Sequence, residues 1–246
     1  MDGIALIDIS GLAKPIIFQS IRRELAEKGR VLVCHAGALN YYPLQDDLER
    51  LFAAEKSDRS SDFLDSLAGL LTGEKGPYEA VSLVDEQSDP SRSRALLAFA
   101  SPKHERLFSL LDRREFDYIE VITPTSSSPR ARVAGIAADF VSKNYPNTKV
   151  ARIDTDDLNG LVRYLDEQYL DVYGTAGSNL ELGLTGSKVQ AVACAILSSR
   201  RKVAQAWYLS PREFDEKRFS SGVGPIRIFD IQLTNRESDH PPPCHS

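Results

Sequence analysis

Cysteine is scarce in this chain. The three cysteines, Cys34, Cys194 and Cys244, are far apart in the sequence, and none forms a CxxC pair. An odd number at such spacing argues against a disulfide framework and against a zinc module. Cys34 and Cys194 stand inside apolar runs, which predicts that both are small buried core residues.

A surplus of basic charge is missing as well. The chain has 30 lysine and arginine residues against 35 aspartate and glutamate residues, and its formal net charge is -5. Broad electrostatic binding to duplex nucleic acid needs a surplus of lysine and arginine. The composition therefore excludes that mode of binding, although it leaves room for a local basic patch.

Long apolar runs are also absent. No run approaches the roughly 20 residues that a membrane-spanning helix needs. The first residues lack the basic region and the apolar region of a signal peptide. We therefore expect a soluble, cytoplasmic protein without a membrane partner.

The chain does have ample apolar material and a regular alternation of segments. Hydrophobic residues make up 42% of its 246 residues, which is enough for a substantial core. Strands are expected at residues 4–9, 31–34, 79–84, 94–100, 118–123, 149–153, 179–184, 203–209 and 226–233, and helices at 16–28, 103–114, 130–144, 156–172 and 187–200. This order is typical of an α/β fold with a doubly wound, mostly parallel, Rossmann-like sheet and helices on both faces. The last strand is expected at an antiparallel edge.

The same pattern suggests how the chain is divided. We expect one domain over residues 1–236, with an irregular helical insertion at about residues 41–76. Residues 237–246 include three consecutive prolines and are expected to form a disordered tail.

Ligands of open parallel sheets bind beyond the carboxyl ends of the strands. Helix N-termini meet there, and their unpaired N–H groups attract anions. The first turn of this kind contains Asp8, Ser10 and Gly11, with Lys14 shortly after. These residues could hold an anion, because Gly11 lets a ligand approach the backbone closely. The alternative is a helix cap followed by a solvated lysine.

The second turn is rich in hydroxyl groups and runs from residue 123 to residue 132. Arg130 and Arg132 follow five hydroxyl residues at a helix start, and guanidinium groups match phosphate and carboxylate oxygens well. The alternative is a surface loop with an N-cap serine.

The third turn is the strongest candidate for a phosphate site. The strand that contains Glu181 runs into Thr185, Gly186, Ser187 and Lys188, and an apolar helix of small residues begins at once. The helix N–H groups and the lysine could bind an oxyanion. The turn is not a Walker A loop, because the Gly-Lys-Ser/Thr order is missing.

These residues resemble the motifs of a known protein family. The strand Asn-Leu-Glu-Leu-Gly-Leu, the turn Thr-Gly-Ser-Lys and the helix that follows resemble the signature turn of CARF domains, the Rossmann-like sensors of cyclic oligoadenylates in CRISPR-linked and related antiviral systems. The turn at residues 8–11 stands where that family has its other ligand loop, and the aromatic strand around Trp207 is similar. The resemblance implies a phosphate-rich ligand such as a cyclic oligonucleotide, a two-fold homodimer that shares it, and a separately encoded effector.

Three classes of function stay open on the sequence alone. The first is a nucleotide-sensing domain in antiviral defence. The second is a phosphodiesterase or nucleotide hydrolase that uses His35 or Asp8 as its acid–base group, although His35 could also be a packed core residue. The third is a scaffold subunit that binds no ligand. We expect neither a cofactor nor a metal ion. The segment from Glu74 to Tyr78 is interpreted as a lid or as an exposed turn.

Overall fold

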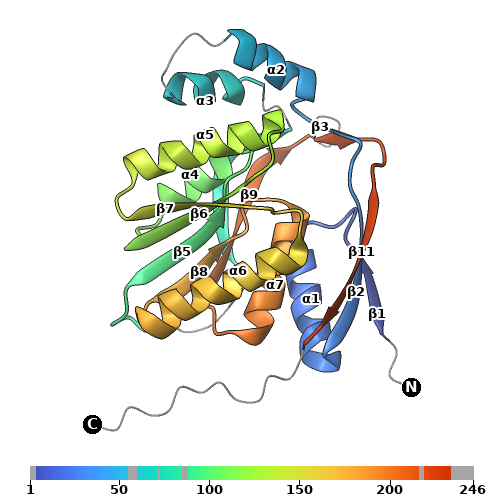
Figure 1. Ribbon diagram of the computed structural model, residues 1–246, viewed down its shortest axis with the longest axis vertical. Helices are drawn as coiled ribbons and strands as arrows, with labels where there is room; N and C mark the ends of the chain where they lie inside the picture. Colours follow the sequence, from blue (N-terminus) through green and yellow to red (C-terminus); the bar gives the residue numbers. More distant parts are fainter. Residues whose placement is uncertain (1–3, 55–59, 71–72, 85–87, 216–218, 234–246) are drawn as a thin grey trace.

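The largest feature of the computed structural model is a six-stranded sheet in the middle of the molecule (Figure 1). The structure describes residues 4–54, 60–70, 73–84, 88–215 and 219–233. The strand order is β4-β9-β8-β5-β6-β7, and only the edge pair β4–β9 is antiparallel. The strands are β4 (Glu74–Ser82), β9 (Gln205–Phe214), β8 (Asn179–Gly183), β5 (Arg94–Phe99), β6 (Tyr118–Pro124) and β7 (Thr148–Ile153). The expected mixed α/β architecture with a mostly parallel sheet is confirmed.

Helices cover both faces of this main sheet. On β5, Leu96 and Ala98 pack against α4 (Glu105–Leu111) and α5 (Pro129–Asn144), whereas Leu97 and Phe99 pack against α6 (Leu158–Tyr169) and α7 (Lys188–Arg200). Because β5 is buried on both faces, its residues 95–99 are all apolar and appear in the sequence as a continuous run. A short π-helix (Leu170–Thr175) extends α6. Within the described ranges, no helix has the length and apolar character needed to cross a membrane.

A second, smaller sheet corrects the expectation of a single sheet. It consists of β1 (Ala5–Asp8), β2 (Arg30–Ala36) and β11 (Ile226–Gln232), with β1 parallel and β11 antiparallel to β2. The first βαβ unit and the last strand therefore lie outside the main sheet. The expected antiparallel direction of the last strand is right, but the antiparallel edge of the main sheet is β4.

The packing of α7 explains this separation. Ten consecutive residues of α7, from Val189 to Ser198, are buried, because α1 (Lys14–Lys28) lies between α7 and the small sheet (Figure 1). A helix that is apolar all round needs neighbours on every side. Alanine at alternate positions of α7 lets α1 approach closely, so the βαβ unit stacks on a helix layer rather than beside a strand.

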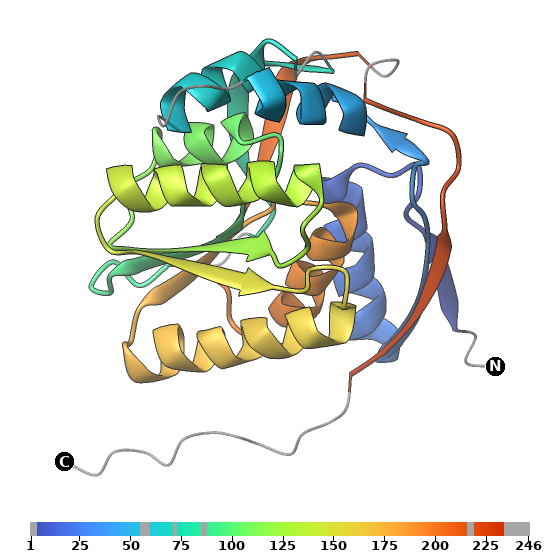
Figure 2. The same ribbon diagram turned by 45° about the horizontal axis from the view of Figure 1, so that its top comes forward.

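A two-stranded ribbon extends from the small sheet over the molecule (Figure 2). It pairs β3 (Asn40–Tyr41) with β10 (Ser220–Ser221), and it leads to α2 (Gln45–Ala54) and α3 (Ser60–Ala68), which pack on α5. Gly224 donates to the Gly37 carbonyl at 2.7 Å, and a Cβ at Gly224 would lie 2.9 Å from the Ala38 carbonyl oxygen. The glycine is needed for this close approach of two backbones.

The cysteines show how the small sheet differs from the core. Cys194 is buried in α7, as expected, but Cys34 is only half-buried. Val31 and Val33 point from β2 into the core, so Cys34, the next residue along the strand, points to the outer face. The expectation for Cys34 is therefore wrong. Cys244 and the expected tail at residues 237–246 lie outside the described residues.

Candidate functional site

The first and third candidate turns lie against each other, although β1 and β8 belong to different sheets. The Lys188 ammonium donates to the Ile9 carbonyl at 3.1 Å and to the Ser10 carbonyl. Packing of α1 on α7 places the two turns together, because β1 precedes α1 and β8 precedes α7. Ser10 and Lys188 thus share one side of the molecule.

The Ser10 turn is held by its own side chains. Asp8 Oδ1 accepts from the Ser10 amide at 2.9 Å and from the Ser10 hydroxyl at 2.5 Å, and the same hydroxyl accepts from the Ala36 amide at 2.8 Å. The Ser10 hydrogen bonds lower the pKa of Asp8, so this carboxylate stays ionised. Gly11 has open space where a Cβ would lie.

The alternative interpretation of this turn, a helix cap and a solvated lysine, is wrong on both counts. The N-cap of α1 is Ala13, which provides no side-chain cap. Lys14 is buried and donates to the Leu184 carbonyl at 2.9 Å. Burial lowers the pKa of Lys14 well below its usual value, because a charged ammonium loses its hydration there.

The turn at residues 185–188 is closed by internal hydrogen bonds. The Thr185 hydroxyl accepts from the Phe99 amide at 3.1 Å and donates to the Phe99 carbonyl at 2.6 Å. Ser187 and Gln190 form a capping box at the start of α7. A Cβ at Gly186 would lie 1.6 Å from Gln190 Oε1. Thr185 and Gly186 are buried, so a ligand reaches Gly186 only if Gln190 moves.

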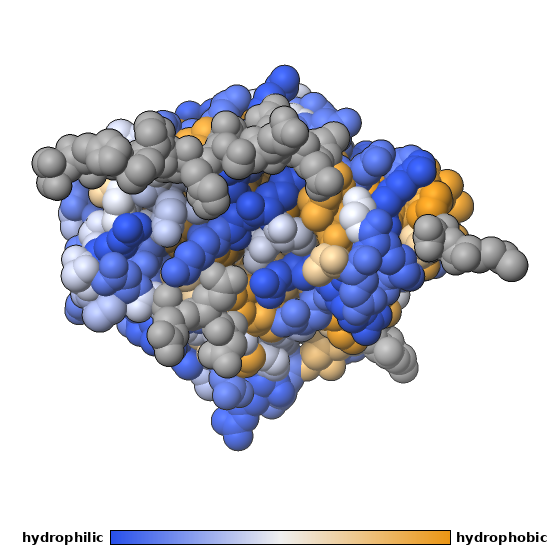
Figure 3. Space-filling model, turned by 90° about the horizontal axis from the view of Figure 1, so that it is seen from below, coloured by the Kyte–Doolittle hydropathy of each residue, from blue (hydrophilic) through white to orange (hydrophobic). Residues whose placement is uncertain are grey.

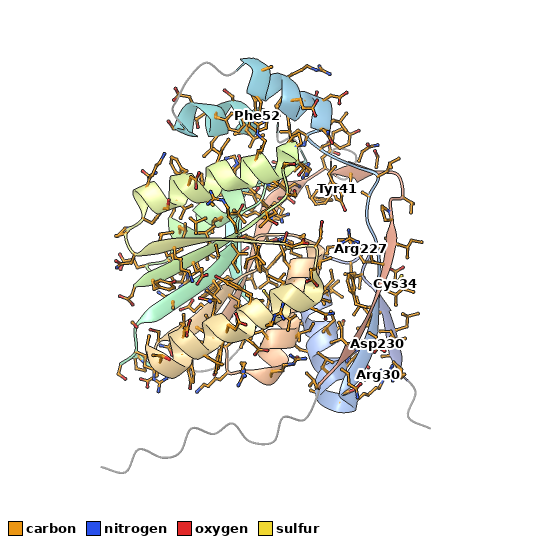
Figure 4. All side chains as sticks on the ribbon, viewed as in Figure 1. Arg30, Cys34, Tyr41, Phe52, Arg227 and Asp230 are labelled. Atoms are coloured by element: carbon orange, nitrogen blue, oxygen red, sulfur yellow. The ribbon has the colours of Figure 1, made fainter. Side chains whose placement is uncertain are left out.

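The two arginines of the second turn point to different places. The Arg130 guanidinium donates to the Tyr41 carbonyl at 3.4 Å and to the Pro43 carbonyl at 3.2 Å, and burial lowers its pKa. Arg132 lies over the ring of Phe52 on α2, 3.8 Å from its centroid. Figure 4 labels Tyr41 and Phe52, which lie well apart. Arg132 is therefore not brought to the other candidate residues. The N-cap serine of the alternative interpretation is present, because Ser128 caps α5.

His35 lies half-buried at the end of β2, opposite Arg227 of β11. Burial lowers its pKa, and the charges of Lys188 and Arg227 act in the same direction. His35 is therefore neutral near pH 7 and able to accept a proton. Arg227 forms an ion pair with Asp156 at 3.4 Å, and sequence reasoning missed it. The alternation Ile-Arg-Ile in the last strand could have identified Arg227 as a polar side chain on the inner face.

A buried ionic cluster on the same edge was also missed. Glu74 accepts from Arg106 Nε at 2.9 Å and lies 3.1 Å from the Lys103 ammonium. The Tyr78 hydroxyl donates to Glu74 at 3.4 Å. Glu74 and Tyr78 are buried in β4, so the interpretation of this segment as a lid or an exposed turn is wrong. Lys103 lies in the turn after β5, four residues beyond Phe99. The rule that selected the other turns could have found it.

The Lys103 ammonium is the least well paired of these groups. It lies 3.4 Å from the ring centroid of Phe219, and it has no hydrogen-bond partner of good geometry within the described residues. Burial lowers its pKa to about 8, although the charge of Glu74 opposes this shift. The charges of Arg106 and Lys103 lower the pKa of Lys14, and the charges of Arg106 and Arg130 lower the pKa of Lys103. These four side chains therefore lie close to one another.

We call five cations the cationic edge: Lys14, Lys103, Arg106, Arg130 and Lys188. They lie at or beside the carboxyl ends of β1, β5, β6 and β8. Within the part of the chain that the structure describes, Arg106 and Lys103 are the two that contact a carboxylate, and both contact the same one, Glu74. The other three donate to neutral backbone carbonyls. The edge therefore holds more positive than negative charge, which is costly for buried groups.

Other parts of the described chain provide weaker candidates for a ligand or metal site. A shallow depression lined by Tyr118, Tyr145 and Lys149 lies at the amino ends of β6 and β7, on the opposite edge of the sheet. Among the described residues, no group of three or more His, Cys, Asp or Glu side chains could hold a metal ion.

No protein-family model, curated protein or solved structure matches this chain.

Proposed function

We propose that the cationic edge binds a phosphate-rich ligand, such as a nucleotide or a cyclic oligonucleotide, and that the protein is a sensor of that ligand. One observation carries the proposal. Lys14, Arg130 and Lys188 donate to backbone carbonyls, which orient a cation without neutralising its charge. The resemblance to CARF domains leads to the same ligand class and implies a role in antiviral defence.

The electrostatics favour an anion with several charges. Burial lowers the pKa of four cations of this edge, because the charged form of each loses hydration in the folded protein. These cations are Lys14, Lys103, Arg130 and Lys188. A bound phosphate would raise these pKa values again, because an opposite charge favours the ionised form. Ligand binding near pH 8 should therefore be accompanied by proton uptake, chiefly at Lys103.

Binding at this place could be transmitted through Lys188. Its ammonium connects α7 of the main body to the carbonyls of Ile9 and Ser10, which follow β1 of the small sheet. A phosphate that draws Lys188 away would weaken this connection. The ligand would then shift an equilibrium between two positions of the Ser10 turn, provided that it binds one of them better.

A titration with inorganic phosphate and with linear and cyclic nucleotides tests the proposal. Calorimetry should detect binding, and chromatography should recover the ligand unchanged. Lys188→Ala should weaken binding by about 1.5–3 kcal/mol, because a charge-assisted contact is lost. The control is Lys143→Ala, which removes an exposed lysine near the end of α5. Equal affinities for both variants, at equal melting temperatures, would contradict the proposal.

A hydrolase that uses the same place is the second candidate. It is favoured by the neutral state of His35 and the ionised state of Asp8, which are the states of a general base and of its electrostatic partner. Recovery of cleaved nucleotide, with cleavage abolished in His35→Ala, would support the hydrolase. A melting temperature that no nucleotide changes would instead favour a scaffold without a ligand.

A further inference from the structure

The outer face of the small sheet carries an uncovered apolar surface. Its inner face packs on α1, so the alternate side chains of its strands point outward. Ile226 and Ile228 of β11 are 65% and 68% exposed, and Leu6 of β1 is 66% exposed. Leu32 and Cys34 of β2 lie between them in the sheet register. We call Ile4, Leu6, Leu32, Cys34, Ile226 and Ile228 the outer patch.

This concentration is unusual for the molecule. Twelve large apolar side chains are exposed in the described part of the chain, and four of them belong to the outer patch. Two more, Leu39 and Val223, lie in the ribbon that continues β2 and β11. Figure 3 shows apolar side chains gathered on the side of the molecule where the small sheet lies. Contiguous apolar surface of this kind marks an interface.

The charges on this face identify the partner. Arg30 and Asp230 form an ion pair across β2 and β11, with hydrogen bonds of 2.9 Å and 2.5 Å, and their side chains are 41% and 50% exposed. The register also places Asp8 of β1 on this face, next to Cys34, so the face carries one cation and two anions among its apolar side chains. The same patch turned by a two-fold axis presents an anion to each cation, so the surface is complementary to itself.

We infer that two copies of this chain associate through the outer patch, with their small sheets packed face to face. The side chains of two stacked sheets interdigitate, and the apolar residues are thereby removed from water. Arg30 of each copy lies within reach of Asp230 of the other. This inference is independent of the proposed ligand site, because the outer patch and the cationic edge share no residue.

The area of the patch predicts the strength of the dimer. Three strands of up to seven residues cover a projected area of about 14 Å by about 23 Å. The ribbon enlarges it, but the patch stays below the roughly 800 Å² per partner that stable interfaces bury. The dimer should therefore be weak and should dissociate on dilution.

Sedimentation velocity of the full chain without nucleotide, over a wide range of concentration, tests the inference. The wild type should shift from monomer to dimer as the concentration rises. Ile228→Glu should raise the dissociation constant roughly tenfold or more, because it places a charge at the centre of an apolar contact. The matched control is Leu170→Glu, which changes a 49% exposed leucine outside this face and should leave the dimer intact. A wild type that stays monomeric, or two variants that behave alike, would overturn the inference.

A charge-swap experiment distinguishes a second copy from a different protein partner. Arg30→Asp and Asp230→Arg should each weaken the homodimer, because each variant opposes charges of equal sign. A mixture of the two variants should form a heterodimer, since all ionic contacts between the chains are then of opposite sign. Modification of Cys34, followed by peptide mass spectrometry, should slow at concentrations at which the dimer forms. Failure of the mixture to associate would exclude this face-to-face arrangement.

Discussion

The main sheet and the small sheet differ in how many of their faces are buried. Every residue of β8 in the main sheet is buried, because α4 and α5 cover one face of the sheet and α6 and α7 the other. The small sheet is covered by α1 on one face, and its outer face leaves Leu6 and Ile228 exposed. The main sheet forms the core that stabilises the domain, whereas the small sheet exposes the outer patch and carries the Ser10 turn.

Truncation of one apolar residue in each sheet should separate these roles. Leu97→Ala on β5 should lower the free energy of unfolding by about 3–4 kcal/mol, because Leu97 is fully buried and leaves a cavity. Ile228→Ala on the outer face should cost the monomer no more than about 0.5 kcal/mol. Urea denaturation at low protein concentration measures both values. Similar losses would mean that the outer face is covered within one chain.

The two sheets also differ in the burial of their ion pairs, and the expected effects on stability are smaller than that of Leu97→Ala. Glu181 on β8 is buried, accepts from Arg94 Nε at 2.7 Å and accepts from Trp207 Nε1 at 2.6 Å. Glu181→Ala should cost about 2–3 kcal/mol, because both donors lose their acceptor. The side chain of Arg94 is 35% exposed, and water at that arginine limits the loss. Asp230→Ala in the small sheet should cost much less than Glu181→Ala, since its pair with Arg30 is exposed and water screens it. Thermal melting of both variants measures the difference.

The comparison also shows what the sequence could and could not predict. The parallel strands β5, β6, β7 and β8 were predicted to within a residue or so at each end, because burial on both faces produces apolar runs such as that of β5. The antiparallel strands β4 and β9 were each missed by five residues at one end. The sheet to which β1 and β2 belong depends on the packing of α1 against α7, and no local pattern encodes that contact. The small-residue character of α7 was recognised but was attributed to a ligand turn, whereas the neighbouring α1 explains it.

The candidate site was predicted to a similar extent. The turns that contain Ser10 and Lys188 were identified, and they do lie together. The partners of Lys188 are backbone carbonyls. Because every residue has one, the sequence does not show which carbonyls Lys188 contacts. Glu74 was misinterpreted because it precedes a glycine and a proline, which suggest a turn, whereas pairing with β9 holds it in a buried strand.

The last predicted effect depends on pH and concerns Lys103 on the cationic edge. Burial holds the pKa of Lys103 at about 8, against 10.5 for a free lysine. Between these values the unfolded chain binds a proton at Lys103 that the folded chain does not, so the stability of the folded state rises with pH. The wild type should therefore gain up to about 3 kcal/mol relative to Lys103→Met as the pH is raised through this window. Urea denaturation at several pH values tests this. Lys143→Met should run parallel to the wild type, because that ammonium is in water in both states, and parallel curves for Lys103→Met would mean that Lys103 keeps its proton when folded. In that case the cationic edge would be fully charged in the absence of an anion, and proton uptake would not accompany ligand binding.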